Sequence, residues 1–530
     1  MTEARDIVVI GAGHNGLVAA AALARHGLRP LVLERRGQIG GGIVTEEIHP
    51  GFRCPTISHL AGPLASSVAR EVDLAREGLE ILKPEVRVFA PGLDGSALLL
   101  YDDPARTAAA LGQRNDEEGK RYLRFHARLE KYGRLFARYA NMTPPDIEAP
   151  GLDELFEGLR LSRGFRQLAR ADAFALLRWL PMAVADLVGE SFETERLRAA
   201  VAARGTWGMF AGPWSAGTGA NLLLQTAFDS HSAGPAAFVR GGPGALAGAL
   251  AGAARRAGVE IRADAEVAQI LVRDGKAVGV ALASGEEISA RAVVSNADPK
   301  RTFLRLIEPT HLDPDFLTRL RNYRSTGTAA KVNLALSALP IFRALDGNAN
   351  AAGVLAGRIH IGDDIDSLER AFDAAKYGDF SARPYCDVAI ASVADPSLAP
   401  AGAHVLSAWV QHAPYRLKEG NWHERREALG DAVVATLASY APGLERLVVA
   451  RQVLVPPDLE EVCGWTGGHV FHGEPALDQL FTMRPLLGWA RYRTPIAGLY
   501  LCGAGTHPGG GVTGAPGVNA SREIWKDWRR

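Results

Sequence analysis

Short apolar runs separated by glycine-rich turns form the first part of the chain. Residues 7–10 read Ile-Val-Val-Ile, an apolar run that is typical of a strand buried on both faces. Residues 17–26 are rich in leucine and alanine and predict a helix, which Gly27 ends. Residues 31–33 predict a second strand. The pattern therefore predicts a strand, a helix and a second strand in succession.

Strand-like patterns return in the middle of the chain and again near residue 500. Between the first unit and this return, residues 104–207 are mostly helical in pattern and rich in arginine, leucine and alanine. From residue 239 onward we expect a helix at 245–257, strands at 259–262, 265–272, 277–282 and 287–295, and a hairpin turn at Asp274-Gly275. Later segments predict strands at 328–336, 404–411 and 498–503 and a last helix from about residue 517. The chain is thus expected to leave one sheet domain twice and to return to it twice.

Composition places the chain among ordinary globular proteins. Its 530 residues exceed what one hydrophobic core supports, so we expect two or more domains. Lys+Arg and Asp+Glu both number 59, and this zero net charge argues against nucleic-acid binding. No C-x-x-C pair and no zinc-like Cys/His spacing occurs, which excludes the local redox motif of the flavin disulfide reductases. We expect reduced thiols at Cys54, Cys386, Cys463 and Cys502.

Two stretches bear on membrane association. No run of 18 apolar residues occurs, and residues 205–228, although uncharged, are interrupted by glycine, proline and polar residues, which predicts buried loop and helix. Residues 174–188 are mildly amphipathic, so this helix either packs in the core or an interface, or touches a membrane surface. The early first strand leaves no room for a leader in this sequence. We expect a cytoplasmic protein, with a mitochondrial matrix location only for a eukaryotic source.

Candidate chemistry begins with the glycines after the first strand. Gly11, Gly13 and Gly16 fit G-x-G-x-x-G, in which the glycines allow a tight turn, close approach of a pyrophosphate and close packing of helix on strand. The helix N-terminus offers free N–H groups and a positive dipole end to phosphate. Glu34 ends the second strand, where an acid binds ribose hydroxyls and disfavours NADP. These residues predict a dinucleotide site and leave FAD and NAD open.

Four sequence blocks resemble one superfamily of flavoproteins. They are the glycine fingerprint, residues 241–267, Val293-Val-Ser-Asn-Ala-Asp298 and Tyr500-Leu-Cys-Gly-Ala-Gly-Thr-His-Pro-Gly-Gly-Gly-Val512. On these blocks the chain is similar to FAD-dependent oxidoreductases of the phytoene desaturase and amine oxidase superfamily. Residues 34–36, 39–41, 45–52, 467–473 and 478–480 further resemble the mitochondrial branch named for a pyridine nucleotide-disulfide oxidoreductase domain, together with its bacterial relatives. The resemblance extends over nearly the whole chain and favours FAD.

The resemblance implies an α/β fold. A discontinuous Rossmann-type FAD-binding domain, like that of glutathione reductase, is expected to carry an inserted α+β substrate domain. The FAD-binding domain is expected to comprise residues 1–75, 235–300 and 494–530. The substrate-binding domain is expected to comprise residues 76–234, which are largely helical, and residues 301–493.

The resemblance also implies which residues bind FAD. The expected set is Gly11, Gly13, His14, Asn15, Gly16, Glu34, Arg35, Gly40, Gly41, Gly42, Val267, Gly503, Gly505, Gly511 and Val512. In this set, Glu34 binds the adenosine ribose, and Arg35 and Val267 lie at the adenine. Gly503, Gly505 and the 511–512 region approach the ribityl chain and the flavin. Many relatives have an arginine where this chain has Gly42, so a positive charge on the flavin side is missing or is supplied elsewhere.

Histidines and aromatic residues of the later segments are weaker candidates. His507 either orients the flavin or relays a proton, or else holds its loop through hydrogen bonds. His469, His472 and Glu474 lie in a glycine loop and are expected to be structural rather than metal ligands. Three aromatic residues are expected either to line a substrate pocket or to pack in the core: Trp465, Phe471 and Phe481.

The implied chemistry is hydride transfer between a hydrophobic small molecule and the flavin, in a dehydrogenase, desaturase, isomerase or oxidase. Such a substrate needs an apolar, water-poor cleft and little acid–base machinery, and we name no catalytic acid or base. Two alternatives stay open. One is a flavin-binding regulatory or interaction protein with little turnover, and the other is an NAD-dependent dehydrogenase that uses only the first motif.

Overall fold

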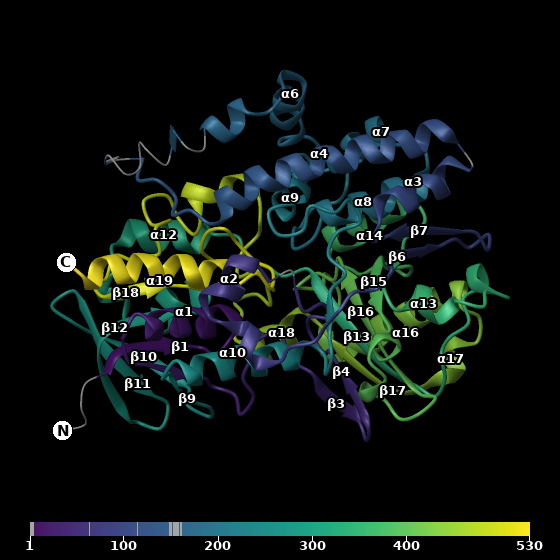
Figure 1. Cartoon of the computed structure of the whole chain (residues 1–530). Helices are drawn as coiled ribbons and strands as arrows, with labels where there is room; N and C mark the ends of the chain where they lie inside the picture. Colours follow the sequence, from purple (N-terminus) through teal and green to yellow (C-terminus); the bar gives the residue numbers. More distant parts are fainter. Residues whose placement is uncertain (1–4, 63, 114, 148–150, 152–157, 160–161) are drawn as a thin grey trace.

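Two seven-stranded sheets organise the part of the chain that the structure describes. The structure, a computed structural model, describes residues 5–62, 64–113, 115–147, 151, 158–159 and 162–530 (Figure 1). Figure 1 shows the first sheet on the left beside α19 and the second on the right, with a layer of helices above them.

The first sheet joins three distant parts of the chain. β12 (Glu287–Ser295) pairs in parallel with β1 (Arg5–Ile10) on one side and with β18 (Leu499–Leu501) on the other. Beyond β1 the sheet continues in parallel through β2 (Pro30–Leu33) and β9 (Glu260–Arg262), and beside β12 it ends in the antiparallel strands β11 (Lys276–Leu282) and β10 (Val267–Arg273). The predicted returns to one sheet are therefore observed, and the predicted α/β, Rossmann-type fold is confirmed.

Helices cover both faces of this sheet, which is why residues 7–10 of β1 and the whole of β2 are apolar. Ile7 and Val9 of β1 face a core shared by α1 (His14–Arg25), α10 (Pro243–Arg256) and α19 (Ala515–Trp528). Val8 and Ile10 face the opposite core, to which α11 (Pro299–Arg305) and α12 (Pro314–Asn322) contribute. The alternation follows from the two-residue period of a strand.

The second sheet takes strands from both excursions of the chain. Its order is β17 (Val448–Leu454), β13 (Ala329–Leu336), β16 (His404–Gln411), β15 (Cys386–Ala389), β14 (Arg358–Ile361), β6 (Val86–Pro91) and β7 (Ala97–Tyr101). β6 and β14 pair in parallel, whereas the other neighbours are antiparallel. This pairing brings the segments before and after the central Rossmann strands into one structural unit.

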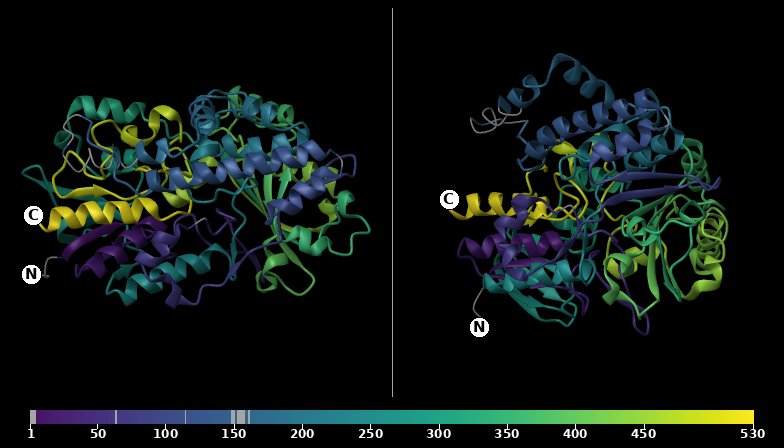
Figure 2. Two further views of the ribbon diagram at one scale, coloured as in Figure 1. Left: turned by 45° about the horizontal axis from the view of Figure 1, so that its top comes forward. Right: turned by 45° about the vertical axis from the view of Figure 1, so that its right-hand side comes forward.

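A helical layer covers the β6–β7 end of this sheet. It consists of α3 (Pro104–Gly112), α4 (Asp116–Ala140), α6 (Arg170–Trp179), α7 (Val184–Ser191), α8 (Glu195–Gly205) and α9 (Thr218–Gln225). The expected amphipathic helix at 174–188 is divided into α6 and α7, and α6 exposes Phe174 and Leu177. In Figure 1 and in the right-hand view of Figure 2, α6 lies outermost in this layer. Among the described residues, no helix is long and apolar enough to cross a membrane.

The remaining elements connect and cap the two sheets. The other helices are α2 (Ser66–Glu71), α13 (Ala351–Leu355), α14 (Ile365–Lys376), α15 (Ala391–Ala394), α16 (Trp422–Tyr440), α17 (Leu444–Leu447) and α18 (Pro456–Cys463). The other strands are β3 (Glu46–His49), β4 (Phe52–Cys54), β5 (Ile81–Leu82) and β8 (Phe238–Val239). Short 3-10 turns lie at Leu74–Glu77, Pro309–His311, Arg343–Leu345, Pro396–Leu398, Leu477–Gln479 and Phe481–Met483.

The close packing of α19 on α1 generates a stability prediction. A Cβ atom at Gly517 would lie 2.4 Å from the carbonyl oxygen of Asn15, whereas a Cβ atom at the exposed helical residue Gly248 would meet nothing within 4 Å. We expect Gly517→Ala to lower the free energy of unfolding by about 1–3 kcal/mol through overpacking. Gly248→Ala is the matched control and should raise it by up to about 1 kcal/mol. Thermal unfolding measures both, and an unchanged Tm for Gly517→Ala would contradict this packing.

A buried histidine after β16 generates a prediction of pH dependence. His412 is 2% exposed, and burial lowers its pKa from 6.5 to about 3. Below pH 6.5 the unfolded chain therefore binds a proton that the folded chain does not, so stability falls as the pH falls. The loss reaches about 1.4 kcal/mol per pH unit for one such group. We expect His412→Asn to flatten the fall of Tm between pH 6.5 and 4.5; asparagine tolerates the positive φ of this position.

The exposed His423 provides the control, since water surrounds its side chain in the folded and the unfolded chain alike. His423→Asn should leave the dependence of Tm on pH as it is in the unaltered protein. An equal effect of the two substitutions would show that burial of His412 does not shape the acid response.

Candidate active site

A long cavity lies at the carboxyl ends of the parallel strands of the first sheet. Ile10, Leu33 and Asn296, which end or follow β1, β2 and β12, line one part of it. Trp409 of β16 in the second sheet and the side chains of α9 line another part. Crevices at this edge of a parallel sheet are the usual ligand sites of α/β proteins. The cavity therefore lies between the two sheets.

The glycine turn after β1 is shaped by Asn296. The Nδ2 atom of Asn296 donates to the carbonyl oxygen of Gly11 at 3.4 Å, and a Cβ atom at Gly13 would come within 2.8 Å of that nitrogen. A Cβ atom at Gly16 would lie 2.2 Å from the Gly11 carbonyl oxygen, which confirms that this glycine lets α1 pack on the strand. The turn leaves the amino end of α1 open toward the cavity, as a bound phosphate requires.

Glu34 is held in place at the end of β2. Its side chain is 7% exposed and lines the cavity. Oε2 accepts the N–H of Ala12 at 2.8 Å, and Oε1 accepts the N–H of Arg36 at 3.0 Å. Each carboxylate oxygen keeps a further lone pair for a ligand. Arg35 and Val267 also line the cavity, and Arg35 donates to the backbone carbonyl of Val462 at 2.6 Å.

Three cavity residues carry buried polar atoms without a partner. These atoms are Oδ1 of Asn15, Nη2 of Arg36 and Nδ1 of His472. An unpaired buried polar group costs about 1–3 kcal/mol, so such atoms favour a polar ligand. Together with the open glycine turn and the fixed Glu34 carboxylate, they fit the pyrophosphate and sugar groups of FAD.

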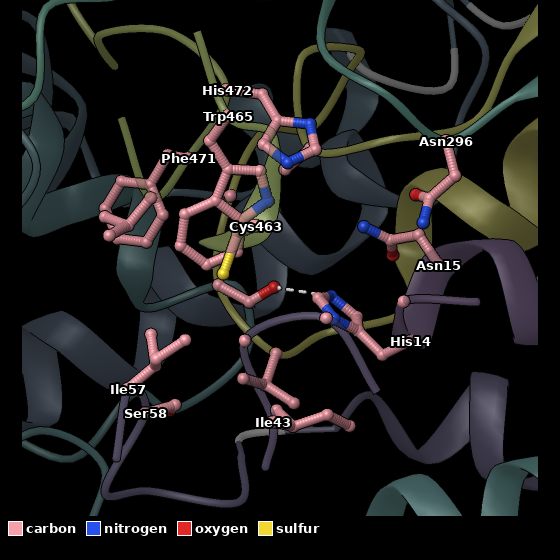
Figure 3. A pocket seen from close by; sticks show the side chains of 18 of the residues that line it. His14, Asn15, Ile43, Ile57, Ser58, Asn296, Cys463, Trp465, Phe471 and His472 are labelled. Carbon is pink, nitrogen blue, oxygen red and sulfur yellow. Dashed lines mark hydrogen bonds between the residues drawn. The ribbon is translucent and has the colours of Figure 1, made fainter. Parts of the chain in front are cut away.

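A histidine connects the glycine fingerprint to the last glycine-rich segment. Nε2 of His14 donates to the carbonyl oxygen of Gly511 at 3.1 Å, because a carbonyl only accepts (Figure 3). Burial lowers the pKa of His14 to about 4. Burial and the nearby charge of Arg484 lower the pKa of His472 to about 3. Both histidines are therefore neutral at pH 7 and present hydrogen-bonding groups without adding charge to the cavity.

Gly42 lies beneath an indole ring. A Cβ atom at Gly42 would lie 2.7 Å from Cη2 of Trp465. Figure 3 shows Trp465 beside Phe471 and His472 at the cavity. The space beside Gly42 is therefore filled by Trp465, from the segment after α18, and none of the described atoms nearest to Gly42 is cationic.

The structure brings most of the predicted FAD-binding residues to one cavity. Those that line it are Gly11, Gly13, His14, Asn15, Glu34, Arg35, Gly41, Gly42, Val267, Gly511 and Val512. Gly16, Gly40, Gly503 and Gly505 do not line it. A Cβ atom at Gly503 would lie 2.7 Å from the Asn296 carbonyl oxygen, and one at Gly505 would lie 2.4 Å from Cδ of Pro299. Both glycines thus allow close packing behind the loop, and their approach to the flavin stays a prediction.

The structure places some of the weaker candidates at the cavity and others away from it. His507 lies behind the cavity wall, fully buried, with Nε2 donating to the carbonyl oxygen of Tyr139 at 2.8 Å. This hydrogen bond holds the loop in place, which is the structural one of the roles expected for His507. Trp465 and Phe471 line the cavity, whereas Phe481 packs on Tyr139 and His507. His469 bonds the carbonyl oxygen of Gly208, which is a structural role.

Several cavity residues were not foreseen from the sequence. They come from the loop after β4, from the α8–α9 region and from the second sheet, and include Ile57, His59, Leu60, Trp207, Asn221, Leu224, Gln225, Phe228 and Trp409. The absence of charge from residues 205–228 was the one available signal, and it predicted burial without indicating a cavity.

The Rossmann sheet and the cavity at its edge define a dinucleotide-dependent enzyme. The model of the flavin containing amine oxidoreductase family matches residues 100–524, and that of the NAD(P)-binding Rossmann-like domain matches residues 9–72. The chain therefore belongs to the flavin-containing amine oxidoreductase family. It is a FAD-dependent oxidoreductase, as the sequence blocks predicted.

Three relatives illustrate the range of the family around this chain. It is 36% identical to the mouse pyridine nucleotide-disulfide oxidoreductase domain-containing protein 2, over 98% of this chain and 93% of that protein. It is 27% identical to a limonene dehydrogenase polypeptide of Castellaniella defragrans, over 98% and 94%. It is 28% identical to the neurosporene-forming phytoene desaturase of Cereibacter sphaeroides, over 99% and 94%. The likeness to phytoene desaturases is thus distant, whereas the superfamily and the likeness to the pyridine nucleotide-disulfide oxidoreductase domain-containing proteins are confirmed.

The contact between Gly42 and Trp465 can be tested by a double-mutant cycle. We expect Gly42→Ala to reduce the affinity for FAD about tenfold or more, because the new methyl group displaces the indole ring over the cavity. Trp465→Ala removes the clash, so adding Gly42→Ala to it should cost no further affinity. FAD titration monitored by flavin fluorescence gives the four dissociation constants. Additive losses would contradict a direct contact between the two residues.

Proposed function

We propose that this oxidoreductase dehydrogenates or desaturates a neutral, hydrophobic small molecule, and that FAD, when bound, would supply the hydride acceptor. The observation that carries the proposal is the composition of the cavity wall away from the FAD-binding residues. Aromatic and aliphatic side chains make up most of it: Leu60, Trp207, Leu224, Phe228, Trp409 and Leu480. Apolar walls with few polar groups are typical of sites for hydrophobic ligands.

Carboxylates are absent from this part of the wall. Among the described residues, the acids that line the cavity are Glu34 and Glu266. Glu34 follows β2, and Glu266 lies just before β10 and pairs with Arg301 at 3.3 Å. Both therefore lie at the end of the cavity expected to hold adenosine. A cationic amine bound against this apolar wall would be buried without a counter-ion, which costs several kcal/mol.

A buried ionic cluster behind the wall further disfavours a cationic substrate. Nζ of Lys331 lies 3.3 Å from Nδ1 of His59, and Nε2 of His59 donates to Asp387 at 3.0 Å. Arg358 pairs with the same carboxylate at 2.5 Å. Burial lowers the pKa of Lys331 only to about 8, so it stays protonated at pH 7. The cluster thus holds two cations and one anion, which opposes a cationic substrate next to His59.

The side chains of the wall have three tasks in this proposal. The rings of Trp207 and Trp409, with centroids 6.0 Å apart, hold the substrate and exclude water from the reacting carbon. His59 is fixed through both ring nitrogens and completes the wall. When bound, FAD supplies the hydride-accepting chemistry. The names of two relatives, limonene dehydrogenase and phytoene desaturase, refer to terpene hydrocarbons, which supports a neutral substrate.

Anaerobic reduction of the bound flavin tests the proposal. We expect limonene to bleach the flavin absorbance of the FAD-loaded protein, and cyclohexylmethylamine, which is cationic at pH 7, to leave it unchanged. Trp409→Ala should slow bleaching about tenfold or more at unaltered FAD content. The control, Trp422→Phe, changes an indole that lies outside the cavity and should leave the rate unchanged.

Bleaching by the amine but not by neutral hydrocarbons would contradict the proposal. Absence of bleaching by limonene, other terpene hydrocarbons and polyenes would instead favour the alternative of a flavin-binding regulatory protein. These outcomes concern the substrate and leave the assignment of the cofactor intact.

A further inference from the structure

We propose that Asn221 and Gln225 of α9 form a subsite that binds a hydroxyl group of an otherwise apolar substrate. This inference rests on the proposed function and specifies the substrate class as a hydrophobic alcohol. It follows from the residues that α9 presents to the cavity, from the hydrogen bonds that fix its two amide groups, and from the absence of a described donor bonded to the two amide oxygens.

The helix α9 and the turn after it present one continuous face to the cavity. Asn221, Leu224, Gln225 and Phe228 all line it. Their spacing of three, four and seven residues places them on the same side of a helix. Two amides are therefore set among two apolar side chains, with Trp207 from the preceding loop also in the wall.

Backbone carbonyl groups fix the orientation of both amides. Nδ2 of Asn221 donates to the carbonyl oxygens of Gly205 at 3.0 Å and Trp207 at 2.8 Å. Nε2 of Gln225 donates to the carbonyl oxygen of Arg204 at 2.7 Å. A carbonyl oxygen only accepts hydrogen bonds, so each amide must turn its nitrogen toward the backbone. The oxygen of each amide then points the other way.

These two amide oxygens are open acceptors. No donor among the described residues bonds Oδ1 of Asn221 or Oε1 of Gln225, and neither oxygen belongs to the enclosed atoms that lack a partner. Asn221 is only 4% exposed, and it lines the cavity, so its open oxygen faces the cavity interior. The structure thus offers two acceptors in the cavity wall to which no described donor bonds.

The chemistry of the subsite selects a neutral donor. A carbonyl, ether or carboxylate oxygen of a ligand would meet acceptor with acceptor, whereas a hydroxyl group satisfies the amide oxygens. An ammonium group also donates, but no carboxylate lines this part of the cavity among the described residues. Its charge would therefore be buried without a counter-ion. A hydroxyl on an apolar skeleton is the group that meets both conditions.

Binding of three matched ligands to the FAD-loaded protein tests the subsite. The ligands are cyclohexylmethanol, its methyl ether and methylcyclohexane, and the perturbation of the flavin absorbance reports binding. We expect the alcohol to bind at least about tenfold more tightly than the ether, because only the alcohol donates. Gln225→Met should reduce this preference to about threefold or less and leave the affinity for methylcyclohexane unchanged.

Two further variants separate recognition from a local structural effect. Gln225→Glu keeps an acceptor oxygen and loses the bond to the Arg204 carbonyl, so it should retain the preference for the alcohol. Leu224→Met changes an apolar neighbour on the same face and should also retain it. Loss of the preference in Gln225→Glu equal to that in Gln225→Met would overturn the proposal.

The outcomes for the unaltered protein separate this inference from the proposed function. Equal affinities for alcohol and ether would overturn the hydroxyl subsite and leave the hydrophobic substrate intact. Failure of all three ligands to bind would overturn both. A preference for the alcohol that disappears only when the acceptor at residue 225 is removed would support both.

Discussion

The pairing of β12 with strands from both ends of the chain is the constraint on which the site depends. β12 lies between β1 and β18 in parallel, so three segments that are hundreds of residues apart end at one edge of a sheet. Asn296 follows β12 and shapes the glycine turn after β1. The loop after β18 brings Gly511 to His14. Without this pairing, neither the glycine turn nor the last glycine-rich segment would face the same cavity.

The features that could be predicted from the sequence are those that local physics determines. Buried parallel strands read as apolar runs, and the turn before α1 needs glycine, so β1, α1 and β2 were predicted correctly. The wall at α9 was not predicted. Its cavity-facing residues have a helical spacing that any buried helix also shows, and only the placement of α9 against the other elements makes that face a wall.

Glycines of the last segment show a second limit of sequence reasoning. A glycine-rich motif indicates close approach of the backbone to something, but not to what. For Gly511 the neighbour is the cavity, whereas for Gly505 it is Pro299. Likewise, the family is named for amines, yet the aromatic wall between the sheets holds no carboxylate among the described residues. The segments outside the first sheet therefore supply the residues proposed to contact the substrate, whereas the first sheet and its loops supply the residues expected to bind the cofactor.

The discontinuous first sheet also orders events during synthesis. Residues 499–513, which supply β18 and one wall of the cavity, leave the ribosome after nearly all of this sequence has been made. FAD therefore cannot be enclosed by a nascent chain that stops short of them. Such a chain would also leave the edge of β12 unpaired, which invites association with other chains. Enclosure of the cofactor is thus a late step, which waits for β18 and the last glycine-rich segment.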